Sequence, residues 1–215
     1  MTVGFSGIIM AVFIAFQMLF PFMPFYALGC LFATCVIHSF IYSEHRSEME
    51  NTNRKAFVDG LTGVKNKLAY LESLRDLERH AKEDSYEGYG LVVFDLNGLK
   101  EVNDTLGHDA GDEYIKSACR LICETYNHSP VFRIGGDEFV VILKGGDFEN
   151  RVLLKEQFDK TIDENRTNGK VVVSSGMAVF DSEIDESYTE VFIRADKKMY
   201  ERKTALKAAD KNQPV

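Results

Sequence analysis

Two short stretches of the sequence place carboxylates where they could act on phosphates. Asp95 ends an apolar run, Leu91–Phe94, that is typical of a buried strand. A carboxylate in such a place is costly unless it is paired or bound to a metal. The second stretch is Gly135-Gly136-Asp137-Glu138, directly before the apolar run Phe139–Leu143. Its adjacent glycines permit positive φ and a tight hairpin, and they let a phosphate approach the backbone.

Each stretch also has an ordinary structural interpretation. Asp95 taken alone is better explained as an N-cap for the turn that follows it, because Asp is favoured there. The two glycines fit a simple hairpin with carboxylates on its surface, although an Asp-Glu pair that begins so apolar a strand is unusual for that purpose. If Asp95 and Asp137 lie on neighbouring strands, they form an oxygen-rich cluster of the kind that binds two magnesium ions for nucleotidyl transfer.

The elements that would position these carboxylates alternate along the chain. Apolar spacing predicts helices over 66–82, 110–126, 148–165 and 188–207, and strands over 89–96, 131–134, 138–143 and 171–180. This order predicts an α/β body with one hairpin at its centre. A turn at Asp59-Gly60-Leu61-Thr62-Gly63 opens the body.

The N-terminal segment has a different composition. No Asp, Glu, Lys or Arg occurs from Met1 to Ser43, so the whole formal charge of −8 lies on the rest of the chain. Two apolar runs, Gly4–Phe20 and Phe25–Tyr42, are each near the lower limit for a membrane-spanning helix, and the prolines between them favour a break. We predict two spanning helices over 1–43. The alternatives are one long bent helix and a signal peptide, which normally opens with a Lys or Arg.

The residues after this segment indicate its orientation. Residues 44–58 lack Gly and Pro and predict a helical connector, whose role is either signal transmission or simple spacing, to a domain over 59–210. The basic residues Arg46, Arg54 and Lys55 follow the second run and favour a body in the cytoplasm of a multi-pass inner (plasma) membrane protein. The acidic balance of the body argues against nucleic acid as a partner.

The four cysteines do not indicate a disulfide framework. Cys30 and Cys35 lie in the apolar segment, and Cys119 and Cys123 are four residues apart in a helical pattern, where buried free thiols are common. A metal site completed by His128 is the less favoured alternative.

Longer motifs connect the two carboxylate stretches. The string FDLNGLKEVNDTLGHDAGD, from Phe94 to Asp112, and the later RIGGDEF resemble the GGDEF family of diguanylate cyclases. The resemblance begins at the Asp59 turn, continues through Val173–Gly176 and ends in a last helix near Lys203, so that it covers nearly the whole body. It implies a nucleotidyl-cyclase-like fold, a polymerase-palm-like central sheet flanked by helices, here preceded by transmembrane helices.

The resemblance also implies roles for individual residues. Two Mg²⁺ ions, or Mn²⁺ in their place, would be held by Asp95, the backbone carbonyl of Leu96, Asp137 and Glu138. Asp137, Glu138 and Lys100 would act in catalysis, with Asp137 assisting deprotonation of the ribose 3′-hydroxyl and Lys100 facing the phosphates. The GTP-binding residues would be Asn103, His108, Asp112, Gly135, Gly136, Lys203 and Lys207. Asn103 and Asp112 would read the guanine.

Three of these residues have plain structural alternatives: a turn for Asn103, capping or packing for His108, and a helix-dipole interaction for Asp112. The sequence also departs from the family pattern in two places. Thr204–Lys207 replaces a Gly-Arg-Asn-like ending, so Lys207 would have to substitute for an arginine on the triphosphate. Tyr126–Ser129 lacks both residues of the Arg-x-x-Asp product-inhibition site that many members carry, so we predict no inhibition there.

Together these implications predict a diguanylate cyclase that condenses two GTP into cyclic di-GMP and releases two pyrophosphates in membrane-linked second-messenger signalling. Each domain would bind one GTP, so the reaction would need a homodimer with facing domains. The alternatives are a catalytically silent module that binds GTP or cyclic di-GMP, and a cyclase for another nucleotide pair. Silent relatives usually lose the acidic hairpin residues, and Asp137 and Glu138 are both present.

Overall fold

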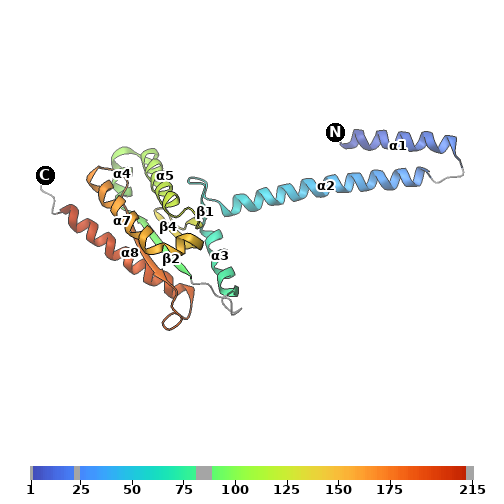
Figure 1. Cartoon of the computed structure of the whole chain (residues 1–215). Coiled ribbons are helices and arrows are strands. Elements are labelled where there is room, and N and C mark those ends of the chain that lie inside the picture. Colours follow the sequence, from blue (N-terminus) through green and yellow to red (C-terminus); the bar gives the residue numbers. More distant parts are fainter. Residues whose placement is uncertain (1, 22–24, 81–88, 212–215) are drawn as a thin grey trace. The chain divides into compact units, whose positions relative to one another are not determined.

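The computed structural model describes every residue except 1, 22–24, 81–88 and 212–215. The chain divides into two compact units, Met1–Ala56 and Phe57–Val215 (Figure 1).

The N-terminal unit is built from two helices, α1 (Thr2–Leu19) and the long α2 (Phe25–Phe57). The predicted break falls between them, since α1 ends before a turn at Pro21. The two helices pack closely: a Cβ atom on Gly29 would lie 2.6 Å from the Cβ atom of Phe13, so glycine is what permits this approach. The predicted connector is the helical continuation of α2.

One stretch of this unit could cross a bilayer. Among the side chains that the structure describes, only Ala27–Glu44 is both long and apolar enough, with a mean hydropathy of 1.4 and 11% of the stretch buried. The apolar stretch of α1, Met10–Leu19, is shorter. At about 1.5 Å per residue it would cover about half of the roughly 30 Å hydrocarbon core. The prediction of two spanning helices is therefore corrected to one candidate span.

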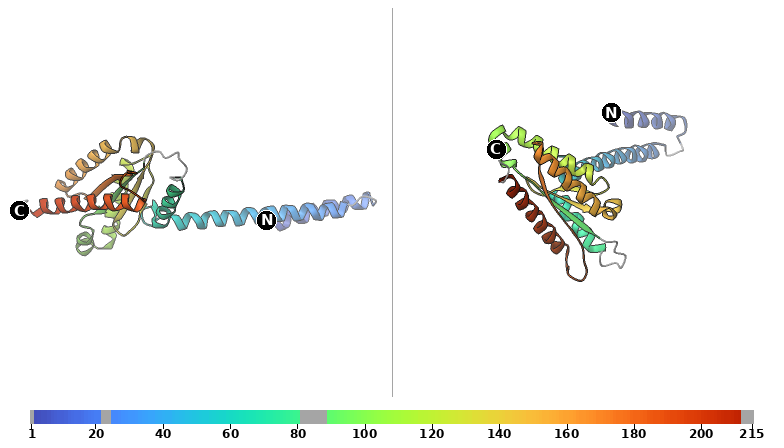
Figure 2. Two further views of the ribbon diagram at one scale, coloured as in Figure 1. Left: turned by 90° about the horizontal axis from the view of Figure 1, so that it is seen from below. Right: turned by 60° about the vertical axis from the view of Figure 1, so that its left-hand side comes forward.

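The second unit is a mixed five-stranded sheet flanked by helices (Figures 1 and 2). Its strand order is β1-β3-β4-β2-β5; β1 and β3 are parallel, and the other neighbours are antiparallel. The strands are β1 (Lys65–Asn66), β2 (Gly90–Leu96), β3 (Val131–Arg133), β4 (Glu138–Leu143) and β5 (Val173–Val179). The helices are α3 (Lys67–His80), α4 (Leu99–Leu106), α5 (His108–Thr125), α6 (Gly145–Glu149), α7 (Arg151–Thr167) and α8 (Tyr188–Lys211).

Strand β2, which lies between β4 and β5, is buried on both faces. Its alternating side chains enter two hydrophobic clusters, with Val92 and Phe94 in one and Leu91 and Val93 in the other. The first cluster includes residues of α5 and α7, and the second includes residues of α3 and most of the buried residues of α8. This arrangement explains the continuous apolar run that predicted the strand.

The larger elements lie within a few residues of their predicted bounds, although residues 81–82 of the helix predicted over 66–82 are outside the described residues; α4, α6 and the two-residue β1 were not predicted. Helix α4 was missed because it has eight residues, none of them buried, between Gly98 and Gly107. Both glycines have positive φ, at 76° and 86°, so they isolate α4 as a separate short helix. The stretch around Asn103, for which a turn was the structural alternative, is therefore helical.

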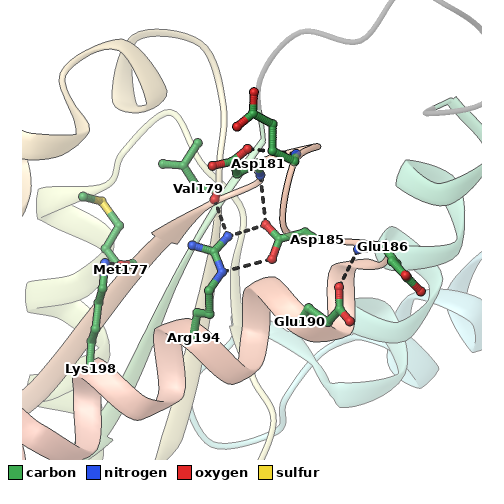
Figure 3. Close-up of polar contacts among 9 residues, drawn as sticks. Met177, Val179, Asp181, Asp185, Glu186, Glu190, Arg194 and Lys198 are labelled. Atoms are coloured by element: carbon green, nitrogen blue, oxygen red, sulfur yellow. Dashed lines mark hydrogen bonds and ion pairs between the residues drawn. The ribbon is translucent and has the colours of Figure 1, made fainter.

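Helix α8 lies directly on the edge strand β5. A Cβ atom on Gly176 would lie 2.1 Å from the Ala195 carbonyl oxygen, so only glycine allows this contact. Arg194 Nη2 donates to the Val179 carbonyl at 2.6 Å, and Lys198 Nζ donates to the Met177 carbonyl at 2.9 Å (Figure 3). These bonds occupy carbonyls on the open edge of the sheet and fix the helix that carries Lys203.

Candidate active site

The register between β2 and β4 brings the two carboxylate stretches together. Asp95 lies opposite Glu138 in the antiparallel ladder, and the Leu96 amide donates to the Asp137 carbonyl at 3.0 Å. Asp95 is therefore near the end of β2, and Asp137 is in the hairpin immediately before the neighbouring strand β4. This placement agrees with the cluster that the sequence predicted.

Asp95 does not cap a helix. Its side chain is 11% exposed, and its Oδ1 accepts from Lys203 Nζ of α8 at 2.5 Å. The N-cap position of α4 is instead held by Gly98, which provides no side-chain bond. The N-cap interpretation of Asp95 is thus wrong, because the strand continues through this residue and the helix starts only at Leu99.

Burial and neighbouring charges shift the pKa values of Asp95 and Glu138 in this cluster. Burial raises the pKa of Asp95 above its ordinary value; Lys203 opposes this rise, and the negative charge of Asp137 adds to it. Burial also raises the pKa of Glu138, and the charges of Asp137 and Asp95 reinforce that rise. The negative charge of Asp137 thus disfavours the ionised form of both neighbours, as expected of a site that favours a cation.

Two hydrogen bonds hold the hairpin in its conformation. The amide of Ile134 donates to the Glu138 carbonyl at 3.0 Å, and Arg133 Nη2 donates to the Gly136 carbonyl at 2.7 Å. Neither glycine appears among the described glycines with positive φ, so the expectation of a positive-φ turn is wrong. A Cβ atom at Gly135 would lie 2.5 Å from Glu138 Oε2, so a larger residue there would displace the exposed end of the Glu138 side chain.

The predicted guanine-reading residues lie on α4 and α5. The Asn103 side chain rests on Gly111, where a Cβ atom would lie 1.9 Å from Asn103 Oδ1. His108 is the exposed first residue of α5, and Asp112 is exposed on the next turn. Lys100 is exposed in the first turn of α4 and has no ion pair with any described residue.

The predicted phosphate-facing lysines of α8 lie beside a pocket. Lys203 and Lys207 line a cavity of about 440 Å³ together with Tyr200, Thr204 and Ala208. Lys207 is exposed, and its charge also reaches the Asp95 carboxylate, whose pKa it lowers less than Lys203 does. The two lysines are thus on the same side of α8 as the carboxylate cluster.

Sequence reasoning missed the residues that anchor this end of the sheet. The Tyr114 hydroxyl of α5 donates to the Asn97 carbonyl at 2.9 Å and accepts from the Val172 amide at 3.0 Å. Ser174 Oγ donates to Asn97 Oδ1 at 2.8 Å. These bonds tie α5 to the ends of β2 and β5, which keeps Asp112 and Asp95 on one rigid frame. No local pattern could have found them, because the partners are 58 and 77 residues apart in sequence.

The donor set consists of oxygen atoms, which suit a divalent cation. No group of three His, Cys, Asp or Glu side chains is close enough to hold a metal within the described ranges. The cluster nevertheless offers oxygen atoms alone, which magnesium prefers, and magnesium normally completes its shell with water and substrate phosphates. The residues that could hold it are Asp95, Asp137, Glu138 and the Leu96 carbonyl.

The alternative metal site at the cysteines is not formed by the described side chains. His128 Nδ1 instead lies 3.2 Å from Oδ1 of the buried Asp147, whose Oδ2 accepts from the His128 amide at 2.9 Å. His128 is therefore engaged with α6, while Cys119 and Cys123 are free thiols of α5.

Comparison with known proteins identifies the fold and the family. Residues 56–209 match the family described as "Diguanylate cyclase, GGDEF domain". The structure of the coiled coil and GGDEF domain of DgcB from Caulobacter crescentus, in complex with c-di-GMP, is similar with a TM-score of 0.69 and 26% identity over 81% of this chain and 95% of that chain. The match covers well over half of the sequence, so the chain belongs to the GGDEF family.

Curated relatives extend beyond this chain. Diguanylate cyclase DgcS of Shewanella oneidensis is 28% identical over 169 residues, which cover 78% of this chain and 56% of the relative. An uncharacterized membrane protein of Staphylococcus aureus is 30% identical over 146 residues, which cover 64% of this chain and 40% of the relative. The chain thus spans about half the length of the curated relatives it matches.

Proposed function

We propose that the body is a diguanylate cyclase that joins two GTP molecules into cyclic di-GMP and releases two pyrophosphates. The observation that carries this proposal is the cluster at the end of β2, where Asp95, Asp137 and Glu138 lie beside Lys203. Burial and the charge of Asp137 raise the pKa of Asp95 and of Glu138, and such carboxylates next to a lysine suit a reaction that moves phosphates and needs a cation.

We assign metal binding and proton transfer to residues of the hairpin and of the end of β2. Asp95, the Leu96 carbonyl, Asp137 and Glu138 would hold magnesium, which when bound lowers the pKa of the attacking hydroxyl and neutralises charge on the phosphates. Asp137 accepts the proton of the ribose 3′-hydroxyl. Gly135 and Gly136 leave the backbone open to the phosphates, because they carry no side chain there.

The remaining residues bind and orient GTP. Asn103 and Asp112 read the guanine edge, on which an Asp accepts from N1 and N2 while an Asn amide meets O6 or N3, and His108 lies near them at the start of α5. Lys203 and Lys207 of α8 and Lys100 of α4 face the phosphates, where positive charge stabilises the transition state.

Cyclic product requires two bodies. One domain holds one GTP, so each 3′-hydroxyl attacks the α-phosphate in the opposite domain, and a two-fold homodimer is the natural arrangement. We propose that the dimer is tethered to the plasma (inner) membrane through the single span at Ala27–Glu44, with the cyclase body in the cytoplasm.

We further propose that the product does not inhibit through the Arg-x-x-Asp position. Tyr126 at the start of that stretch is fully buried, with its ring centroid 5.8 Å from that of Phe94. Ser129 Oγ, at its end, accepts from the Lys144 amide at 3.1 Å. Tyr126 thus packs in the core, and Ser129 binds the loop after β4. Neither residue provides a charged side chain for a ligand.

The test is product analysis of the full chain in lipid nanodiscs with GTP and Mg²⁺. Cyclic di-GMP and pyrophosphate in a 1:2 ratio are expected, and ATP should give no product. Absence of product at high protein concentration, with GTP binding retained, would favour the silent binding module. A product formed from ATP would favour a cyclase of another nucleotide pair. Asp137→Ala should abolish product and leave the fold intact.

A further inference from the structure

Asn97 joins the end of β2 that is assigned to metal binding to helix α4, and three hydrogen bonds hold it. Its amide donates to the Val172 carbonyl at 2.9 Å. Its carbonyl accepts from the Tyr114 hydroxyl at 2.9 Å, and its Oδ1 accepts from Ser174 Oγ at 2.8 Å. Asn97 directly follows Leu96, whose carbonyl is assigned to the metal. These bonds therefore fix the backbone next to that ligand.

The Tyr114 hydroxyl binds backbone groups at the ends of two strands. It donates to the Asn97 carbonyl just after β2, and it accepts from the Val172 amide, at 3.0 Å, just before β5. A tyrosine hydroxyl has one proton to donate, so this proton is used within the protein. Tyr114 thus links helix α5 to both strand ends through a single oxygen atom.

Tyr114 and Asp112 lie on different faces of α5. Asp112 is exposed and precedes Tyr114 by two residues, which is about 200° around a helix with 3.6 residues per turn. The Tyr114 side chain is half-buried and contacts the strand ends, away from the face that carries Asp112. The effect of the hydroxyl on the guanine-reading residues is therefore exerted through the position of α5 and not through contact with the base.

The attachment of α5 to the sheet does not depend on this hydroxyl. The helix buries Ile115, Ala118 and Ile122 in the hydrophobic cluster that includes Phe94 of β2. This burial holds α5 in place when one polar contact is removed. Asn97 is only half-buried, so water can replace the lost bond to its carbonyl. What the hydroxyl adds is a fixed spacing between α5 and the strand ends.

On the basis of the proposed cyclase function, we propose that Tyr114 is a positioning residue that sets the spacing between the two halves of the GTP site. One half is the guanine-reading face of α5, and the other is the metal and phosphate site at the end of β2. A ligand bound to one half brings its other end to the second half at a high effective concentration, provided that the spacing fits. Without the hydroxyl each half keeps its own contacts, but the spacing varies and the advantage of joining the two ends is reduced.

The test compares a whole nucleotide with its separate parts, on the full chain in lipid nanodiscs with Mg²⁺. The whole nucleotide is a GTP analogue with a methylene group between the α- and β-phosphates, which cannot release pyrophosphate. The parts are guanosine and inorganic triphosphate, and competition with a fluorescent GTP analogue measures each Kd. In Tyr114→Phe we expect the Kd of the methylene analogue to rise about tenfold, while the Kd values of guanosine and triphosphate each change less than about twofold.

Two further variants accompany this one. Tyr188→Phe is the matched control, because it removes a tyrosine hydroxyl bond of 2.9 Å to a backbone carbonyl, that of Leu77, between α8 and α3. It should leave all three Kd values unchanged, even where its stability is lower. Ser174→Ala removes the bond to the Asn97 side chain and keeps both bonds to the Asn97 backbone. It should therefore raise the Kd of the methylene analogue by a smaller factor than Tyr114→Phe does.

Three results would overturn the proposal. The first is an unchanged Kd of the methylene analogue in Tyr114→Phe. The second is an equal loss for guanosine or triphosphate alone, because the hydroxyl would then support only one half of the site. The third is an equal loss in Tyr188→Phe, since the loss of any such hydroxyl bond would then have the same effect. A parent that binds neither the methylene analogue nor its parts would instead refute the proposed function, and the role of Tyr114 would fall with it.

Discussion

Arg133 binds Asp59 across 74 residues of sequence, with 3.0 Å between Nη1 and Oδ1, and holds the Gly136 carbonyl with its other terminal nitrogen. The pair thus fixes the first turn of the body to the hairpin that carries Asp137. Burial alone would raise the pKa of Asp59, but hydrogen bonds from Thr62 and from Arg133 outweigh it and keep that pKa below its ordinary value. The pair is mostly enclosed, with exposed side-chain fractions of 12% and 21%.

Arg133→Ala should therefore destabilise the body and weaken catalysis together. We expect a loss of about 1–3 kcal/mol in the free energy of unfolding, because Asp59 and the Gly136 carbonyl lose a charged partner. Urea unfolding of the variant and the parent measures this loss. Arg133→Lys is the matched control, because it keeps the charge but cannot bind both partners. Its free energy of unfolding should therefore lie between those of the parent and of Arg133→Ala. A variant as stable as the parent would contradict the role of the pair.

The pH dependence of stability follows from the same carboxylate. The pKa of Asp59 is lower in the folded protein than its ordinary value of 3.8, so the ionised form is favoured by folding. The contribution of the ionised Asp59 carboxylate to stability is fully present above pH 3.8. It is lost as the pH falls through the pKa that Asp59 has in the folded protein. Asp59→Asn should therefore be less stable than the parent at pH 7 and converge toward it under acid. Parallel unfolding curves at pH 7 and below pH 3.8 check this, and a constant difference would refute it.

Asp95 should change the pH dependence of stability in the opposite direction to Asp59. Its pKa is raised in the folded protein, chiefly by burial, so folding favours the protonated form and the carboxylate weakens the fold at neutral pH. The stabilising contribution of the protonated form is complete below the ordinary pKa and is lost as the pH rises through the folded pKa. Asp95→Asn should then raise Tm at pH 7, by about 2–4 °C for each 1 kcal/mol relieved, while product formation is lost. Calorimetry at pH 7 and product analysis test both parts. A lower Tm would show that the Lys203 bond outweighs burial.

At this site the local elements could be predicted from the sequence, and their long-range contacts could not. The end of a central strand, the hairpin and the helix with Lys203 could all be predicted from motifs, because each motif reports its own local element. What Asp95 contacts could not be predicted, since Lys203 is 108 residues away. The φ of Gly135 was also predicted wrongly, because Gly135 is not among the described glycines with positive φ.

The same limit explains the errors in the helices. Helix α4 has no buried residue, so its pattern is too weak to separate it from a turn. In the N-terminal unit, composition alone predicted two spans, whereas the described apolar stretch of α1 proved too short. Local periodicity thus predicted long, half-buried elements well, and it failed where length or distant partners decide the structure.

Gly111→Ala should act through Asn103. A Cβ atom at position 111 would lie 1.9 Å from Asn103 Oδ1. The side-chain amide of Asn103 on α4 must therefore move away from α5, against which it rests. If Asn103 reads guanine, KM for GTP should rise by about tenfold or more, equivalent to about 1.4 kcal/mol or more, with kcat less affected. Asn103→Ala should give a similar KM, and the double variant should be no worse than either one. Additive losses would show that Gly111 acts independently of Asn103.

The contacts between α8 and the edge of the sheet provide a last test, on stability alone. Arg194 binds the buried Asp185, whose side chain is 1% exposed, and also the Val179 carbonyl. Arg194→Ala leaves that carboxylate short of its charged partner and should lower the free energy of unfolding by about 3 kcal/mol. Lys198→Ala is the matched control on the next turn, because it removes one exposed bond to the Met177 carbonyl and should cost less than about 1 kcal/mol. Chemical unfolding separates the two variants, and light scattering shows whether the uncovered strand edge of Arg194→Ala associates with other copies. Equal losses in both variants would mean that the ion pair with Asp185 contributes nothing beyond an ordinary surface bond.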